Sequence, residues 1–182
     1  MMPTLDPLLT HLAAASVALV LLVSAAQKWR DLGAFEDALA DYALLPVPWL
    51  GPTARLLPAT ETAAGLGLLF VQLRSFGALL AGAVLALVTG AIVINLLRGR
   101  ADIDCGCGGF EDEQHLSWAL VARNAVLLLL VGASVAAAPA RSLSWLDYLS
   151  LVAGAASLFG LYVLTNQLLA NQPRLARLRG RR

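Results

Sequence analysis

Five apolar segments constrain the fold of this chain more than any other feature of its sequence. They cover residues 8–26, 56–73, 76–97, 118–138 and 147–169. A helix needs about 20 apolar residues to cross the hydrocarbon core of a bilayer, and these segments approach or exceed that length. The second segment is the weakest, because it is short and contains Pro58 and Glu61. The pattern predicts an all-α, polytopic membrane protein.

The composition supports this fold class. Of the 182 residues, 59% are hydrophobic and 14% are charged, whereas soluble domains have about 45–50% apolar and about 25% charged residues. The net charge of +1 gives no basic field for nucleic acid, so we expect lipid around the chain and no nucleic-acid partner. The first apolar run has no Lys or Arg before it, unlike a signal peptide, and we interpret it as a retained helix.

The distribution of Lys and Arg predicts the orientation, because these residues concentrate on the cytoplasmic side of membrane proteins. With five spans, residues 27–55, residues 98–117 and the C-terminal tail share one side, and together they hold ten Lys and Arg residues. The N-terminal tail and the links 74–75 and 139–146 hold two. We therefore expect a bacterial inner-membrane protein whose N-terminus is outside and whose C-terminus is cytoplasmic.

Three shorter patterns predict local structure within the connections and spans. Residues 31–42 carry a capping Asp31 and an apolar face at helical spacing, which predicts an amphipathic helix in the membrane interface. That face consists of Leu32, Phe35, Leu39 and Tyr42. The prolines of residues 44–52 are expected to turn the chain into the second span. In the third span, Gly82, Ala86 and Gly90 stand four apart, a spacing that favours close helix packing in lipid.

The predicted organisation is a four-helix transmembrane bundle in residues 1–145, followed by a fifth transmembrane helix and a basic cytoplasmic tail in residues 146–182.

Both cysteines stand in one Cys-Gly-Cys motif, Cys105 and Cys107, directly after the third span. A disulfide between them would close a very small ring, and Gly106 supplies the backbone freedom that such a ring requires. Strained or exposed disulfides are the labile, catalytic ones. The motif therefore favours a redox-active dithiol over a structural staple.

Two other interpretations of the motif stay open. Cys105 and Cys107 could bind zinc or copper together with His115 and Asp104, although the Cys-X-Cys-X7-His spacing matches no strong zinc pattern. Alternatively, the glycines and cysteines merely build a tight loop.

Polar residues inside the spans are costly, and each is a candidate for function. Those near the predicted cytoplasmic ends are Lys28, Glu61, Asn95, Arg123 and Asn124. We expect them to gather beneath the cysteine loop, with Glu61 and Arg123 paired. This pair could assist thiolate formation or simply lock the bundle. Lys28 could instead snorkel to the interface, and the two asparagines could serve as interhelical hydrogen-bond glue.

The sequence resembles the MauE family, which consists of methylamine-utilisation proteins within the DoxX-like group of small helical membrane proteins. The resemblance covers about residues 8–138. It is carried by residues 25–46, 58–66 and 95–109 and by the Arg-Asn pair at 123–124. In the family an aromatic residue usually follows the second cysteine directly, whereas here Gly108 and Gly109 precede Phe110.

The resemblance implies that the chain helps to mature an exported, disulfide-rich amine dehydrogenase subunit alongside a thioredoxin-like protein. Together with the motif, it leads us to expect a membrane thiol-disulfide relay at Cys105 and Cys107. A quinone is the expected electron acceptor if the topology is inverted. The alternative is a non-catalytic assembly factor that holds a metal at the Cys-Gly-Cys loop.

Overall fold

A computed structural model describes residues 5–103, 105, 115–138, 141 and 143–179. Over these residues the chain forms α-helices and one 3-10 turn, which confirms the predicted fold class. In chain order they are α1 (Pro7–Arg30), α2 (Leu32–Asp41), α3 (Val47–Leu69), η1 (Val71–Leu73), α4 (Arg74–Leu97), α5 (Trp118–Ser134) and α6 (Trp145–Arg179).

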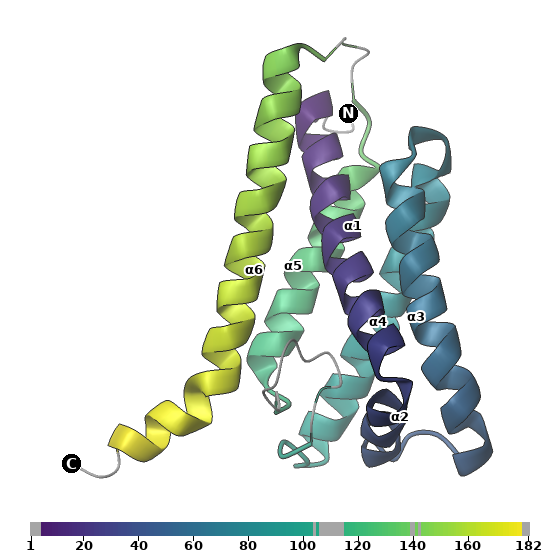
Figure 1. Ribbon diagram of the computed structural model, residues 1–182, viewed down its shortest axis with the longest axis vertical. Helices are drawn as coiled ribbons and strands as arrows, with labels where there is room; N and C mark the ends of the chain where they lie inside the picture. Colours follow the sequence, from purple (N-terminus) through teal and green to yellow (C-terminus); the bar gives the residue numbers. More distant parts are fainter. Residues whose placement is uncertain (1–4, 104, 106–114, 139–140, 142, 180–182) are drawn as a thin grey trace.

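The long helices run side by side along one axis, and α2 lies at one end of them (Figure 1). We call this the α2 end of the bundle. The connection from α1 to α3, the C-terminal end of α4 and the C-terminal part of α6 all lie at the α2 end. The start of α1 and η1 lie at the opposite end. These described helix ends agree with the predicted alternation of the connections between two sides, while the number of spans and the side that faces the cytoplasm stay predictions.

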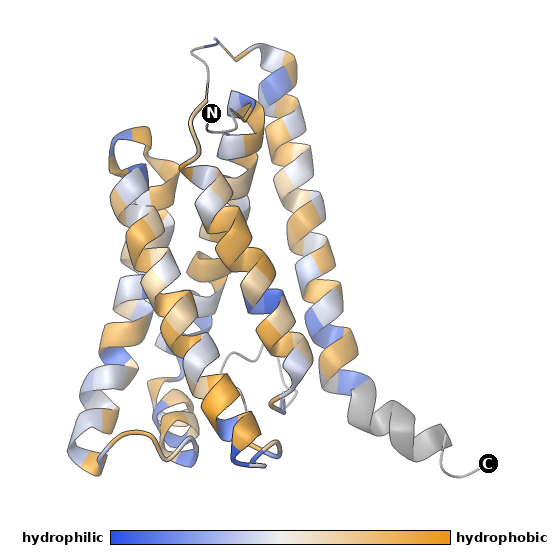
Figure 2. Ribbon diagram, turned by 180° about the vertical axis from the view of Figure 1, so that it is seen from behind, coloured by the Kyte–Doolittle hydropathy of each residue, from blue (hydrophilic) through white to orange (hydrophobic). Residues whose placement is uncertain are grey.

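The chain is a multi-pass membrane protein. Within the described residues, Pro7–Arg30, Val71–Leu97 and Trp145–Leu169 are long and apolar enough to cross a membrane, and α5 is a shorter apolar helix. Large apolar side chains face outward along these helices, such as Leu79 at 70% exposure and Leu129 at 74%. Hydrophobic residues recur along the length of the long helices (Figure 2). Lipid is the solvent in which such a surface is stable.

The second predicted span begins earlier than the sequence pattern indicated. Helix α3 starts at Val47 rather than at residue 56. Pro48 lies in its first turn, where a backbone N–H has no partner within the helix, so the proline costs nothing there. Pro52 and Pro58 stay inside the helix, where each removes one backbone donor. Pro46 therefore precedes α3 as its N-cap, as predicted for a turn into this span, whereas Pro48, Pro52 and Pro58 belong to the helix itself.

The short helix predicted before this span is confirmed as α2. Its N-cap is Asp31, whose Oδ1 accepts a hydrogen bond of 2.9 Å from the backbone N–H of Ala34. Phe35, Ala38 and Tyr42 are buried against the rest of the bundle. The apolar face of α2 therefore covers the end of the other helices.

Helices α3 and α4 approach each other closely at Gly67 and Gly77, outside the predicted small-residue motif. A Cβ atom on Gly77 would lie 2.5 Å from the backbone nitrogen of Leu68 and 2.6 Å from the carbonyl carbon of Gly67. By contrast, a Cβ on Gly90 would meet nothing within 4 Å. A Cβ on Gly82 would meet only the Val131 side chain of α5, at 4.0 Å. Among the described helices, the face of α4 with Gly82 and Gly90 therefore makes no backbone contact as close as that of Gly77.

Candidate functional site

A buried ion pair joins α1 to α3 near the α2 end. The ammonium of Lys28 donates to both carboxylate oxygens of Glu61, at 2.8 and 2.9 Å. It also donates to the hydroxyl of Ser24 at 2.6 Å, and each charged residue is only 4% exposed. The Phe35 ring lies 5.3 Å from the ammonium and closes the pair off on the α2 side. Two charges this deeply buried need each other, because an unpaired charge would have neither water nor a counterion.

Lys28 therefore does not snorkel to the interface. That interpretation considered only its place in the last turn of α1, where a long side chain can reach water. In the structure α2 folds back across the end of α1 and brings Phe35 over the ammonium. Lys28 belongs to the polar site.

Arg123 on α5 lies in a neighbouring set of contacts. Its guanidinium donates to the Asn166 side chain at 2.7 Å and to the Asn124 side chain at 3.3 Å. It also stacks over the Tyr162 ring at 5.4 Å. These contacts link α5 to α6, and Asn166 and Tyr162 are contacts of Arg123 that the sequence analysis did not find.

The two asparagines differ in their partners. Asn124 is buried and donates to the hydroxyl of Thr89 on α4 at 3.1 Å, which confirms its role as interhelical glue. Asn95 donates to the carbonyl of Ala91 in its own helix and accepts from Arg100 at 3.4 Å. Its described bonds therefore organise the end of α4 and do not join two helices.

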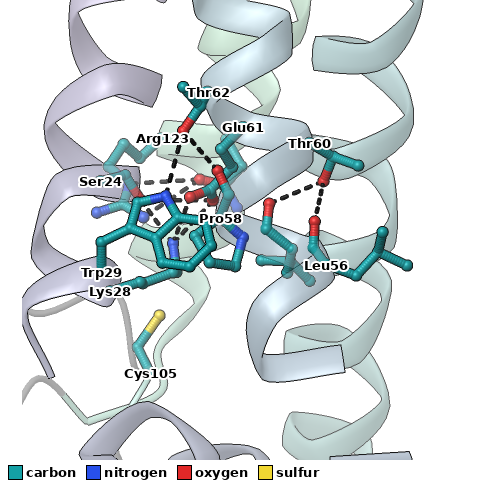
Figure 3. A network of polar contacts seen from close by, with 12 residues as sticks. Ser24, Lys28, Trp29, Leu56, Pro58, Thr60, Glu61, Thr62, Cys105 and Arg123 are labelled. Carbon is teal, nitrogen blue, oxygen red and sulfur yellow. Dashed lines mark hydrogen bonds and ion pairs between the residues drawn. The ribbon is translucent and has the colours of Figure 1, made fainter. Parts of the chain in front are cut away.

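The predicted polar cluster includes residues from three helices. Figure 3 draws Ser24, Lys28, Glu61 and Arg123 within one network of polar contacts. The described ion pair of Glu61 is with Lys28, a pairing that sequence reasoning did not propose. A direct pair between Glu61 and Arg123 stays a prediction.

Cys105 lies below this network, on the α2 side. It is 4% exposed and packs with the buried residues Tyr42, Ile92, Leu116 and Leu120. Its backbone carbonyl accepts a hydrogen bond of 3.1 Å from the Tyr42 hydroxyl. Figure 3 shows its side chain pointing toward Lys28 and Glu61. Cys107 and Asp104 lie outside the described residues.

The Arg-Gly-Arg sequence before the motif fixes where this segment leaves α4. Gly99 has a φ of +74°, the left-handed conformation that glycine adopts most easily. The backbone N–H of Gly99 bonds to the carbonyl of Leu96 and that of Arg100 to the carbonyl of Asn95, which is the Schellman pattern of helix termination. The reversal carries the chain back toward α2.

Arg100 then ties the segment to α2. Its guanidinium donates to the backbone carbonyl of Asp41 at 2.9 Å and to that of Tyr42 at 3.4 Å. Carbonyls at the end of a helix have no partners within it, and an arginine is a favourable donor to them. Arg100 and Tyr42 together hold the backbone at Cys105 against the α2 end of the bundle.

A cavity of about 460 Å³ opens between α2, α3 and α4. Its walls are almost entirely apolar, and they include Phe35, Leu56, Leu57, Leu80, Val84 and Leu87. Lys28 and Cys105 both line it. The charged pair and the cysteine therefore border one apolar space.

Comparison with known proteins places the chain in a family. The model of the family described as methylamine utilisation protein MauE matches residues 6–139. The chain belongs to the MauE family. The matched region spans α1 to α5 and the Cys-Gly-Cys motif, and it ends before α6.

Curated relatives agree with this placement. The methylamine utilization protein MauE of Paracoccus denitrificans is 36% identical over 124 residues, 68% of this chain and 67% of that protein. That of Paracoccus versutus is 35% identical over 135 residues, 74% of this chain and 73% of that protein. That of Methylophilus methylotrophus is 41% identical over 102 residues, 56% of this chain and 54% of that protein. No solved structure matches the chain.

The alternative function of this MauE-family chain places a metal ion at the Cys-Gly-Cys loop. Of its four predicted ligands, Asp104 and Cys107 lie outside the described residues. Cys105 is buried and His115 is exposed. Among the described residues, no group of three or more His, Cys, Asp or Glu side chains could hold a metal ion. Zinc or copper binding at the loop stays a prediction.

Proposed function

We propose that this protein is a thiol-disulfide redox protein of methylamine utilisation, embedded in the bacterial cytoplasmic membrane. Cys105 and Cys107 cycle between dithiol and disulfide and exchange electrons with a thioredoxin-like protein. The exchange supports the maturation of an exported client protein. Membership of the MauE family supports the pathway, and the site at Cys105 supports the chemistry.

The observation that carries the proposal is the shared border of Cys105 and Lys28 on one cavity. The thiolate is the form of cysteine that attacks a disulfide, and a nearby cation stabilises it. Lys28 supplies that positive charge. The carboxylate of Glu61, bonded to the same ammonium, is a proton acceptor at the same place. A cysteine that served only as apolar filler would need neither group.

The exchange step requires no additional reagent. A thiolate of one protein attacks the disulfide of the other, which forms a mixed disulfide and releases one thiolate. The second thiol of the attacking pair then breaks the mixed disulfide. Two electrons and two protons pass between the proteins, so that one dithiol becomes a disulfide and the other disulfide becomes a dithiol.

Trapping of the mixed disulfide tests this proposal. The Cys105→Ser and Cys107→Ser variants are each incubated with a purified thioredoxin-like protein whose second active-site cysteine is replaced by Ser and whose first is held as a mixed disulfide with thionitrobenzoate. The remaining thiolate attacks that disulfide and releases thionitrobenzoate, so no other oxidant is needed. We expect one of the two variants to form a covalent adduct that dithiothreitol releases, and the double variant to form none. Absence of any adduct with both single variants would contradict the redox function.

Metal analysis of the purified protein separates the redox function from the alternative assembly role. We expect substoichiometric zinc and copper in the wild type. One bound zinc or copper per chain, lost in both single cysteine variants, would favour a metal-holding assembly factor.

A further inference from the structure

The cavity beside Cys105 has the dimensions of a binding site for an elongated apolar molecule. Its volume of about 460 Å³ falls within the roughly 300–1,000 Å³ of pockets that bind small molecules. Along α4 its lining runs from Leu80 to Ala91, and the eleven steps between these residues rise about 16 Å along an α-helix. An acyl or isoprenoid chain fits such a space, and an ionic metabolite does not.

This apolar space is bordered by polar and ionisable groups as well. Lys28 and Cys105 are found among its lining residues, and the ammonium of Lys28 is bonded to Glu61. Phe35 lines the cavity and also faces the ammonium at 5.3 Å. A ligand with an apolar tail would therefore meet a sulfur, a positive charge and a proton acceptor at its head.

The position of the motif also demands a partner within the bilayer. Cys105 lies at the α2 end, and a soluble thioredoxin-like protein can reach it from only one face of the membrane. A relay must pass its electrons to a second partner. An apolar cavity between transmembrane helices is open to a carrier that is dissolved in the lipid.

We propose that this cavity binds a membrane quinone, which accepts electrons from the Cys105–Cys107 dithiol. The inference rests on the redox function proposed above, and it adds the electron acceptor. A quinone acceptor serves an exported client in the inverted orientation, in which the α2 end faces away from the cytoplasm. The quinone ring occupies the end at Cys105 and Lys28, and the isoprenoid tail follows the apolar wall toward Leu80. A phospholipid acyl chain could fill the same wall, but it would make no use of the sulfur and the charged pair.

The reaction balances with these groups alone. Both thiols lose their protons and one electron each, a sulfur–sulfur bond forms, and the quinone takes up two electrons and two protons to become a quinol. Lys28 stabilises the negative charge that develops on the quinone oxygens, and Glu61 is able to carry a proton between sulfur and oxygen. The thioredoxin-like protein restores the dithiol.

Quinone reduction by the purified, full-length protein tests the proposal. The dithiol is reduced, freed of reductant and embedded in lipid nanodiscs without oxygen, and decylubiquinone is added. Quinol formation is followed by its ultraviolet absorbance, and thiol loss by the mass shift with a maleimide. We expect one quinol per disulfide formed, and none with the Cys105→Ser variant.

Two matched variants locate the reaction in the cavity. Ala83 and Ala86 are both exposed on α4, but only Ala83 lines the cavity. We expect Ala83→Phe to lower the rate at limiting decylubiquinone about tenfold, and Ala86→Phe to leave it unchanged. Leu87→Trp, at a second exposed lining position, repeats the test if Ala83→Phe does not fold.

Exchange with glutathione disulfide distinguishes failure of this inference from failure of the redox function. If the dithiol reacts with glutathione disulfide but reduces no quinone, or if Ala83→Phe and Ala86→Phe behave alike, the quinone site is wrong and the redox function stands. Copurified phospholipid that Ala83→Phe displaces without any effect on quinone reduction would also overturn the quinone site. A dithiol that reacts with neither oxidant would contradict both proposals.

Discussion

The ammonium of Lys28 lies 2.8 and 2.9 Å from the two carboxylate oxygens of Glu61, although 33 residues separate them in the sequence. The contact joins the last turn of α1 to the middle of α3 in a place that water does not reach. One helix supplies the positive charge and the other the negative charge. The pair therefore locks the two helices together. Its lysine also lines the same cavity as Cys105.

Replacement of one partner of this pair should be more harmful than replacement of both. Lys28→Met leaves the Glu61 carboxylate buried without its described counterion, and Glu61→Gln does the same to the ammonium. We expect each single variant to lose about 3–5 kcal/mol of stability, as is typical when a buried pair is broken. The double variant should lose less than the sum of the two. Thermal unfolding in detergent micelles, followed by circular dichroism, measures the three losses, and strict additivity would show that the two side chains do not interact.

Gly77 should tolerate no side chain, because α3 approaches α4 at this residue. We expect Gly77→Ala to lose at least about 1–3 kcal/mol of stability, since its Cβ would overlap the backbone of Gly67 and Leu68. Gly90→Ala on the same helix is the control, because its Cβ would meet nothing within 4 Å. Equal melting temperatures for the two variants would refute the close contact.

Arg100 should control how well Cys105 is shielded. In a Cys107→Ser background, the 4% exposure of Cys105 predicts slow reaction with a maleimide in the folded protein. Arg100→Gln removes the charged donor to the carbonyls of Asp41 and Tyr42, and we expect it to speed this reaction about tenfold.

Arg98→Gln is the matched control for this experiment, because Arg98 is exposed one residue before Gly99. The control should react like the parent protein. If both arginine variants react equally fast, the bonds from Arg100 to α2 do not hold the segment in place.

The orientation in the membrane can be measured at two exposed positions. In a cysteine-free chain, Gln72→Cys places a thiol at η1, and Ala101→Cys places one just after α4. The excess of Lys and Arg at the α2 end predicts that a membrane-impermeant maleimide labels Gln72→Cys in intact cells and labels Ala101→Cys only after lysis. The reverse result would place the Cys-Gly-Cys motif outside the cytoplasm, the orientation in which a quinone acceptor supports an exported client.

The helices were predictable because a bilayer sets the length of an apolar segment. The start of α3 was not predictable in the same way. A proline such as Pro48 is unfavourable in the interior of a helix but is tolerated in its first turn. The pattern of apolar residues does not show which of these two positions the proline occupies. Likewise, the spacing of Gly82 and Gly90 indicates a surface on which helices could approach closely. It does not indicate which face of α4 meets another helix.

The candidate site was predictable in part. The Cys-Gly-Cys motif and the rarity of ionisable residues in lipid were sufficient to select Cys105, Glu61 and Lys28. The partner of Glu61 and the role of Arg100 depend on contacts between residues 33 to 59 positions apart. Such contacts follow from the way α2 folds under the bundle, which a single sequence does not encode as a local pattern.

The redox state of the two cysteines in growing cells tests the central claim most directly. Cells are quenched with acid, free thiols are blocked, disulfides are reduced, and the released thiols of Cys105 and Cys107 are counted by the gel shift of a polyethylene glycol maleimide. The proposed function predicts that part of the protein carries a disulfide that disappears in either single Cys→Ser variant. Thiols that stay fully reduced throughout growth, with no mixed disulfide in either variant, would contradict it.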